Sequence, residues 1–124
     1  MDNQLLICGL LLAFKHFWLD GPLQTPYQYK NKGTFGHPGG LLHAGLHGAA
    51  TAMIFAPVGL WWFGIVDAVV HYFVDLSKVK LTAKYLWAYY DADSLRITSD
   101  WYFYALMADQ CLHFSTYIML LWLK

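Results

Sequence analysis

Pairs of metal-capable side chains, spaced four residues apart, recur along an apolar chain and constrain its fold more than any other feature. The pairs are His16 with Asp20, His43 with His47, His71 with Asp75, and Asp109 with His113. Residues four apart share one face of a helix, so each pair can present two ligands to one point. Ionisable groups are costly inside membrane-length apolar segments and persist where they pair, line a cavity or bind an ion. The pairs therefore predict four helices that contribute to a single site.

The composition indicates an integral membrane protein. Hydrophobic residues make up 58% of the 124 residues and charged residues only 13%, which is far more apolar than an ordinary soluble domain. A soluble domain of this size exposes much of its surface and could not hide so many large apolar side chains. The formal net charge is zero and no basic tract is present, so the sequence indicates no nucleic-acid partner. We expect one integral membrane domain over residues 1–124, surrounded by membrane lipid, with its oligomeric state left open.

Glycine and proline divide the chain into helices. The first predicted helix ends at Asp20, because Gly21 and Pro22 follow it. A later apolar stretch is divided at Pro57 and Gly59, since proline removes a helical hydrogen bond and glycine favours a reversal. The predicted helices cover residues 4–19, 41–55, 60–77 and 101–123.

Two polar segments connect these helices. Residues 22–40 contain three of the chain's prolines and are predicted to form a loop at the membrane surface. Residues 78–100 mix charged and aromatic side chains, which is typical of the membrane interface. The expected fold is all-α: a polytopic four-helix transmembrane bundle with a short interfacial segment between helices three and four. Sixteen residues rise only about 24 Å, so local thinning of the bilayer should accompany such short spans.

The order of the helices predicts that the pairs lie on one side of the membrane. The first helix carries its pair at its end, the second at its start, and the third, after the reversal, again at its end. The fourth helix starts from that side and carries Asp109 and His113 about 12 to 18 Å along its axis. Most lysines share this side, namely Lys15, Lys30, Lys32, Lys78, Lys80 and Lys84. The positive-inside rule then predicts a bacterial inner-membrane protein with the site towards the cytoplasm and both termini outside.

The paired side chains offer more ligands than one zinc ion requires. The expected metal ligands are His16, Asp20, His43, His47, His71, Asp75, Asp109 and His113. They suit two ions, or one ion whose ligands are oriented by hydrogen-bonded carboxylates. Nitrogen and oxygen ligation favours a divalent metal, zinc first, with iron and manganese as alternatives. The isolated Cys8 and Cys111 indicate neither a disulfide framework nor a zinc ribbon. Asp67, four residues before His71, is expected to hydrogen-bond that histidine or to be a further ligand.

The order and spacing of these residues resemble a known family. The motifs are His16-x-x-x-Asp20-x-x-Leu23-Gln24, Asn31-Lys32, Leu42-His43-x-x-x-His47, His71-x-x-x-Asp75-x-x-Lys78 and Asp109-Gln110-x-x-His113. Together they resemble the bacterial and phage membrane proteins grouped as domain of unknown function 3307, over almost the whole chain. The resemblance implies a small polytopic inner-membrane protein with these histidines and aspartates as its signature. It implies no reaction.

The expected function is that of a membrane-embedded metal-dependent enzyme, with a hydrolase as the first expectation. A bound cation lowers the pKa of water towards neutrality and polarises an ester, amide or phosphoester. An aspartate not held by metal would move the proton, and the candidate catalytic residues are Asp20, Asp75 and Asp109. A site near the membrane surface suits a lipid or lipid-linked substrate. Gln24, Lys30 and Lys32 either hold an anionic group at its mouth or are solvated loop residues.

Other functions use the same residues. A diiron oxygenase or desaturase would take similar ligands, and metal content with visible absorption separates it from a zinc hydrolase. Metal or proton transport, or sensing, is the non-enzymatic alternative, although the nearly apolar outer halves of the helices disfavour a transport path. In a purely structural interpretation the pairs are interhelical hydrogen bonds, each contributing on the order of 1 kcal/mol.

Overall fold

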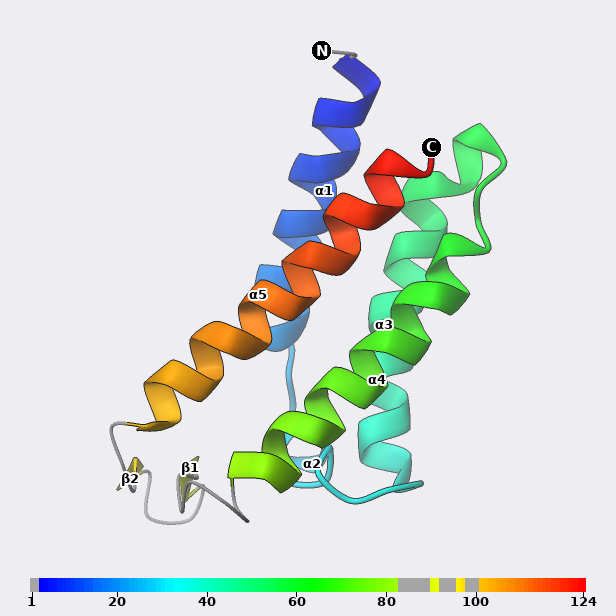
Figure 1. Cartoon of the computed structure of the whole chain (residues 1–124). Coiled ribbons are helices and arrows are strands. Elements are labelled where there is room, and N and C mark those ends of the chain that lie inside the picture. Colours follow the sequence, from blue (N-terminus) through cyan, green and yellow to red (C-terminus); the bar gives the residue numbers. More distant parts are fainter. Residues whose placement is uncertain (1–2, 83–89, 92–95, 98–100) are drawn as a thin grey trace.

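The computed structural model describes residues 3–82, 90–91, 96–97 and 101–124, which form a helical bundle. Its long helices are α1 (Asn3–Asp20), α3 (Pro38–Phe55), α4 (Phe63–Leu81) and α5 (Trp101–Trp122). The two termini and the α3–α4 turn lie at one end of the bundle (Figure 1). The opposite end carries the short α2 (Pro26–Tyr29) and an antiparallel pair of two-residue strands, β1 (Tyr90–Asp91) and β2 (Arg96–Ile97). Apart from this short pair of strands, the described elements are helices, so the predicted all-α class is confirmed.

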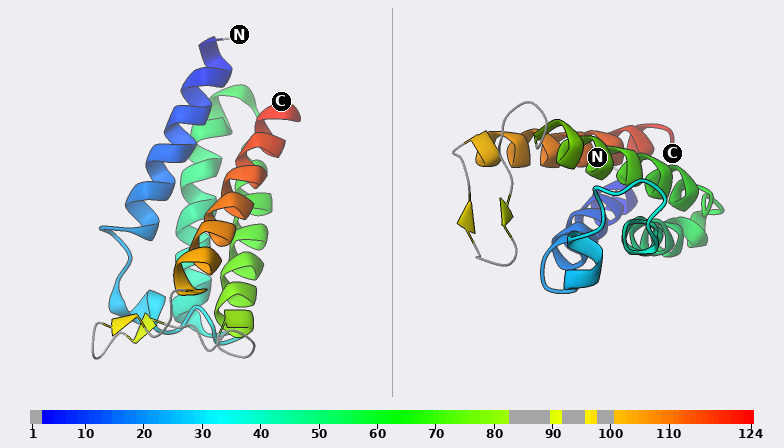
Figure 2. Two further views of the ribbon diagram at one scale, coloured as in Figure 1. Left: turned by 60° about the vertical axis from the view of Figure 1, so that its left-hand side comes forward. Right: turned by 90° about the horizontal axis from the view of Figure 1, so that it is seen from below.

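The four long helices form a closed ring. α1 contacts α3 and α5, and α4 contacts the same two helices (Figure 2). The closest approach is between α3 and α4, where Gly48 faces Gly64 and a Cβ atom at either position would meet the backbone oxygen of the other. Small residues of this kind let helix backbones approach closely. The glycines thereby set the separation of the two helices that carry His43, His47 and His71.

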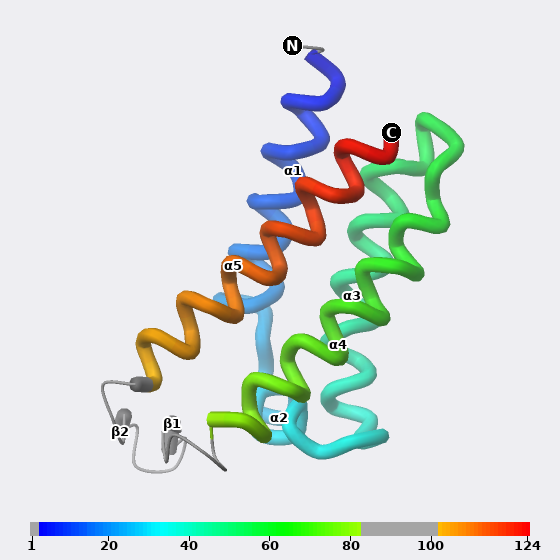
Figure 3. The backbone as a smooth tube through the Cα atoms, in the orientation of Figure 1, coloured from blue at the N-terminus to red at the C-terminus, as the bar shows by residue number. Residues whose placement is uncertain are grey.

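The reversal between α3 and α4 lies where the sequence predicts it. Residues Ala56–Val58 form a single 3-10 turn, η1, which contains Pro57. Gly59 follows with φ +77°, a left-handed conformation that glycine adopts without steric cost. Its N–H donates to the carbonyl oxygen of Ala56 at 3.0 Å. The smooth trace of the backbone shows α4 returning alongside α3 after this turn (Figure 3).

Several helix ends differ from the predicted boundaries. α3 begins at Pro38 rather than at residue 41, because the Nδ1 atom of His37 accepts a hydrogen bond from Gly39 N at 3.0 Å and proline suits the first helical position. α4 begins later than predicted and extends to Leu81, with Lys78 and Lys80 in its last turn, where cations interact favourably with the helix dipole. Most of the predicted interfacial segment, including position 84, lies outside the described residues.

The interior of the bundle is more polar than its surface. Among the described residues, eight buried side chains are hydrophobic and thirteen are polar or charged. Large apolar side chains such as Phe14, Met53 and Ile118 are instead more than 60% exposed. The apolar core, which includes Leu12, Phe55 and several other side chains, lies in the half of the bundle near the termini.

One described segment, Pro38–Val58, is long and apolar enough to cross a membrane. The sequence predicts four such spans, and the remaining helices are found as helices without meeting this criterion. Their internal ionisable residues account for part of the difference, since α4 alone carries Asp67, Asp75, Lys78 and Lys80. The residues that build the site therefore weaken the hydropathy signal of the helices that carry it.

Candidate metal centre

Three of the long helices converge on a first group of possible ligands. Asp20 comes from the last turn of α1, His43 and His47 from the first half of α3, and His71 from α4. One donor atom from each residue lies within 4.8 Å of the others. The histidine side chains are at most 2% exposed, whereas Asp20 is 17% exposed. The carboxylate of Asp20 is therefore the most accessible member of the group.

The separations in this group resemble those of a tetrahedral metal site. The Oδ1 atom of Asp20 lies 2.8, 3.6 and 3.8 Å from the Nε2 atoms of His43, His47 and His71, respectively. The Nε2 atoms of His43 and His71 are 3.2 Å apart. These values bracket the roughly 3.4 Å edge of a tetrahedron whose ligands lie about 2.1 Å from its centre, as in zinc sites. A set of three imidazoles and one carboxylate also suits zinc chemically.

A second group shares His71 with the first. Its other members are Asp75 from α4 and His113 from α5, and the donor atoms again lie within 4.8 Å of one another. The two oxygens of Asp75 face different groups. Oδ2 lies 3.3 Å from His43 Nε2, whereas Oδ1 lies 3.7 Å from His113 Nε2. We call these two groups the candidate metal centre: Asp20, His43, His47, His71, Asp75 and His113.

Six buried polar atoms near this centre have no hydrogen-bond partner among the described residues. They are Asp20 Oδ1, His47 Nε2, His71 Nδ1, Asp75 Oδ2, Asp109 Oδ1 and His113 Nε2. Some lie close to other polar atoms, as Asp20 Oδ1 does to His43 Nε2 at 2.8 Å, but without hydrogen-bond direction. Each unsatisfied buried group costs about 1–3 kcal/mol. All six belong to residues that the sequence identifies as ligands.

The Nε2 atom of His43 has more polar neighbours than it can satisfy. Asp20 Oδ1 lies 2.8 Å away, and Gln24 Nε2 lies 3.1 Å away. His71 Nε2 follows at 3.2 Å and Asp75 Oδ2 at 3.3 Å. An imidazole nitrogen offers either one proton or one lone pair. Such convergence of several donor atoms is what a cation would resolve.

His16 and Asp109, also predicted ligands, fall in neither group. His16 Nε2 lies 2.8 Å from the Oε1 atom of Gln110 and 3.0 Å from Asp20 Oδ2, and its Nδ1 lies 3.1 Å from the hydroxyl of Tyr117. Both ring nitrogens therefore have partners, and His16 is placed to orient Asp20. Asp109 Oδ1 lies 3.6 Å from His113 Nε2, beside the second group, and is one of the unpartnered oxygens.

Lysines at the end of the bundle nearest α2 pair with the site carboxylates. Lys32 Nζ lies 3.1 Å from Asp75 Oδ1, and Lys78 Nζ lies 3.8 Å from Asp109 Oδ2. Burial disfavours the charged form of Lys32, but the carboxylates of Asp75, Asp20 and Asp109 outweigh burial and raise its pKa. Two ammonium groups thus lie beside three carboxylates at this end of the bundle.

Asp67 does not take either role expected from the sequence. Its Oδ2 atom pairs with the ammonium of Lys15 and accepts a hydrogen bond from Thr51 Oγ1 at 2.6 Å. Lys15, counted among the lysines on the site side of the membrane, is buried and donates to the carbonyl oxygen of His47 at 3.2 Å. We call Lys15, Thr51 and Asp67 the paired cluster. Their burial beside α3 and α4 removes Lys15 from the positive-inside argument.

The sequence contained a signal for the polar partners that the sequence analysis did not identify, Thr51 and Tyr117. Continuing the spacing of four by one more turn leads from His47 to Thr51, from His71 back to Asp67, and from His113 to Tyr117. Each long helix after the first thus carries a polar stripe of three residues. The stripes continue past the candidate metal centre into the middle of the bundle.

Comparison with known proteins identifies the family. A family model described as a protein of unknown function (DUF3307) matches residues 6–124. Neither the comparison with curated proteins nor that with solved structures gave a match. Because the match covers nearly the whole chain, this protein belongs to the DUF3307 family.

Proposed function

We propose that this chain is a membrane-embedded, metal-dependent hydrolase. The observation that carries the proposal is the set of six buried, unpartnered nitrogen and oxygen atoms, all from predicted ligands on four helices. Buried polar atoms in proteins are otherwise hydrogen-bonded with few exceptions. A cation bound among the members of the candidate metal centre would give partners to buried atoms that otherwise lack them.

The donor set favours zinc, with iron and manganese as alternatives. Asp20, His43, His47 and His71 supply one four-ligand set, and Asp75 and His113 supply either ligands for a second ion or support for the first. A bound cation of this kind activates water and polarises an ester, amide or phosphoester group. His16 would hold Asp20 in position through the contact of its Nε2 atom with Oδ2 of Asp20.

Asp109 is the best-placed general base. It lies outside both ligand groups, it is buried, and its Oδ1 atom has no hydrogen-bond partner within the described chain. Its neighbour His113 belongs to the second group. Because Asp109 is not a proposed ligand, it can accept a proton beside the cation without breaking a metal–ligand bond, and Lys78 would stabilise its charge. Asp20 and Asp75 then serve as ligands rather than as bases.

The distribution of polarity supports placement in a membrane. In water the exposed apolar side chains would form patches larger than soluble monomers tolerate. In a bilayer the same surface faces lipid, and the buried histidines and aspartates meet the requirement that intramembrane charges pair or bind ions. We accordingly propose four spans in a bacterial inner membrane, with the centre towards the cytoplasm and a lipid or lipid-linked substrate.

The test compares Asp109→Asn with the wild type after reloading metal-depleted protein with Zn²⁺, Mn²⁺ or Fe²⁺. Both proteins are placed in phospholipid nanodiscs, and the release of fatty acid and of phosphate is measured beside bound metal. We expect Asp109→Asn to keep its metal and to lose about 10²–10⁴-fold in rate, the usual contribution of a general base. Equal rates in both proteins, or a rate unaffected by metal removal, would contradict the proposal. An oxygen-dependent product with Fe²⁺ alone would favour the oxygenase alternative.

A further inference from the structure

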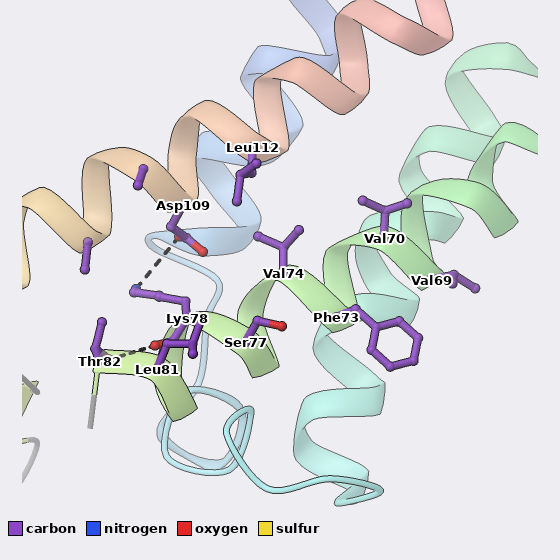
Figure 4. Close-up of a pocket in the computed structure, with 12 residues that line it drawn as sticks. Val69, Val70, Phe73, Val74, Ser77, Lys78, Leu81, Thr82, Asp109 and Leu112 are labelled. Atoms are coloured by element: carbon purple, nitrogen blue, oxygen red, sulfur yellow. Dashed lines mark hydrogen bonds and ion pairs between the residues drawn. The ribbon is translucent and has the colours of Figure 1, made fainter. Parts of the chain in front are cut away.

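An apolar groove lies between α4 and α5 on the outside of the bundle, with a volume of about 500 Å³. Its walls are formed mainly by Val70, Phe73, Val74, Ala105, Ala108 and Leu112. Figure 4 shows these two helices spread apart, with side chains of α4 and α5 directed into the space between them. Phe73 and Leu112 are more than half exposed, so the groove is open to the surroundings of the bundle.

One end of the groove is polar and adjoins the candidate metal centre. Lys78 and Asp109 both line it, and their ion pair joins the two helices across it (Figure 4). Asp109 is only 3% exposed, and its other oxygen lies 3.6 Å from His113 Nε2. A molecule in the groove would therefore reach the carboxylate that we assign as general base.

The groove has the length of an acyl chain in one leaflet. From Val69 to Lys78 it runs along α4 for about 14 Å, at 1.5 Å per residue. Half of the hydrocarbon core measures roughly 15 Å. The apolar part thus extends towards the proposed membrane centre, and Lys78 lies at the end where headgroups would be.

We infer that this groove is the subsite for one acyl chain of a phospholipid substrate, with its phosphate beside Lys78. The inference rests on the proposed function and specifies its substrate class. An apolar trough alone would accept any hydrocarbon. The ammonium of Lys78 at its polar end favours a chain that carries an anionic phosphate, and the contact with Asp109 places the headgroup linkages at the reacting end.

Photo-crosslinking tests the inference. The wild type is reconstituted in vesicles of phosphatidylethanolamine and phosphatidylglycerol that contain phosphatidylglycerol with a photoreactive acyl chain. We expect cross-links to concentrate on groove residues of α4 and α5. Ala108→Trp fills the groove and should lower their yield about tenfold, the effect of losing 1.4 kcal/mol of binding free energy. Ala49→Trp, the same change at an exposed position of α3 outside the groove, should leave it unchanged.

A smaller substitution guards against misfolding. Ala105→Leu adds fewer atoms to the same groove and should lower the yield in the same direction, by about threefold. Lys78→Gln should remove the preference for the anionic lipid when unlabelled phosphatidylglycerol and phosphatidylcholine compete. Labelling spread evenly over the exposed faces of all the described helices, or unaffected by both groove variants, would overturn the inference.

Metal content of the same samples separates the two proposals. If the protein bound stoichiometric metal but was labelled evenly, the metal centre would be supported and the acyl-chain subsite would be contradicted. Concentrated labelling without any metal uptake would contradict the proposed function while supporting a lipid-binding groove. We expect Ala108→Trp to retain full metal content, because Ala108 is exposed on the outer face of α5 and belongs to neither ligand group.

Discussion

The paired cluster and the candidate metal centre lie next to each other in the same bundle and differ in how their polar atoms are satisfied. In the paired cluster, Asp67 binds both Lys15 and Thr51. In the metal centre, five of the six members have a buried atom without a hydrogen-bond partner among the described residues, and the sixth, His43, has more neighbours than it can bond. Helices can thus bury charge in two ways. One cluster is complete by itself, and we propose that the other is completed by a cation.

Removing His71 should have the largest effect, because it belongs to both ligand groups. We expect His71→Ala to reduce bound metal from at least one equivalent to background, as measured by elemental analysis of the purified protein. His37→Asn is the matched control, since asparagine can also cap α3, and it should retain metal. If His71→Ala still bound stoichiometric metal, the candidate metal centre would not need His71 as a ligand. Its side chains, like those of the paired cluster, would then serve mainly as hydrogen-bonding groups.

Breaking the paired cluster should instead lower stability without changing metal content. Asp67→Asn leaves the buried Lys15 uncompensated, which costs about 3–5 kcal/mol in the free energy of unfolding. Replacing both partners, as in Lys15→Met with Asp67→Leu, should recover most of that loss. Unfolding followed by circular dichroism, with metal analysis of the folded fraction, measures both quantities. Loss of metal at unchanged stability would place Asp67 in the metal centre after all.

Substitution of His16 tests whether this residue is a metal ligand or a group that orients one. His16→Phe keeps the ring but removes the contacts with Gln110, Asp20 and Tyr117. Loss of such an orienting group should weaken metal affinity about 10–100-fold, measured by competition with a chromophoric chelator, while saturating metal still binds fully. Gln110→Leu should act in the same direction. If His16→Phe cannot be saturated, His16 is a ligand, as the sequence predicts.

Cys111 should have the smallest effect. It lies between Asp109 and His113 in sequence but is exposed on α5, so it faces away from the centre. Cys111→Ser should change the free energy of unfolding by no more than about 0.5 kcal/mol and leave metal affinity unaltered. The visible spectrum of the Co²⁺-substituted protein reports the same point, since the wild type should lack thiolate-to-cobalt bands. If such bands appeared in the wild type and disappeared in Cys111→Ser, Cys111 would be a metal ligand, which would contradict this prediction.

The parts of the fold that depend on local patterns were predictable from the sequence. The helices, the reversal at Pro57 and Gly59, and the ligand stripes all follow from spacing and turn residues. Pairing between stripes was not predictable, because it depends on how closely helices approach. The contact of Gly48 with Gly64 brings α3 and α4 together so that the rings of His47 and His71 stack with centroids 3.7 Å apart.

Long side chains caused the remaining errors. The long side chain of Lys15 reaches into the bundle and pairs with Asp67 on a different helix, so Lys15 does not act as a charge at the membrane face. Asp67 shares the polar stripe of His71 on α4. Its partners, however, are Lys15 of α1 and Thr51 of α3, and spacing along α4 alone cannot predict them. Periodicity along one helix identified which face carries the polar side chains. Only the three-dimensional arrangement separated the proposed metal ligands from the side chains that pair with or orient them.

Metal uptake by the purified protein tests the central claim most directly. Metal-depleted wild type and a variant with His47→Asn and Asp75→Asn are equilibrated with Zn²⁺ in nanodiscs, and bound zinc is measured by elemental analysis after removal of free ion. Each group loses a member in the double variant. The account predicts at least one equivalent of zinc in the wild type and background levels in the variant. Equal zinc in both proteins, or none in the wild type, would contradict it.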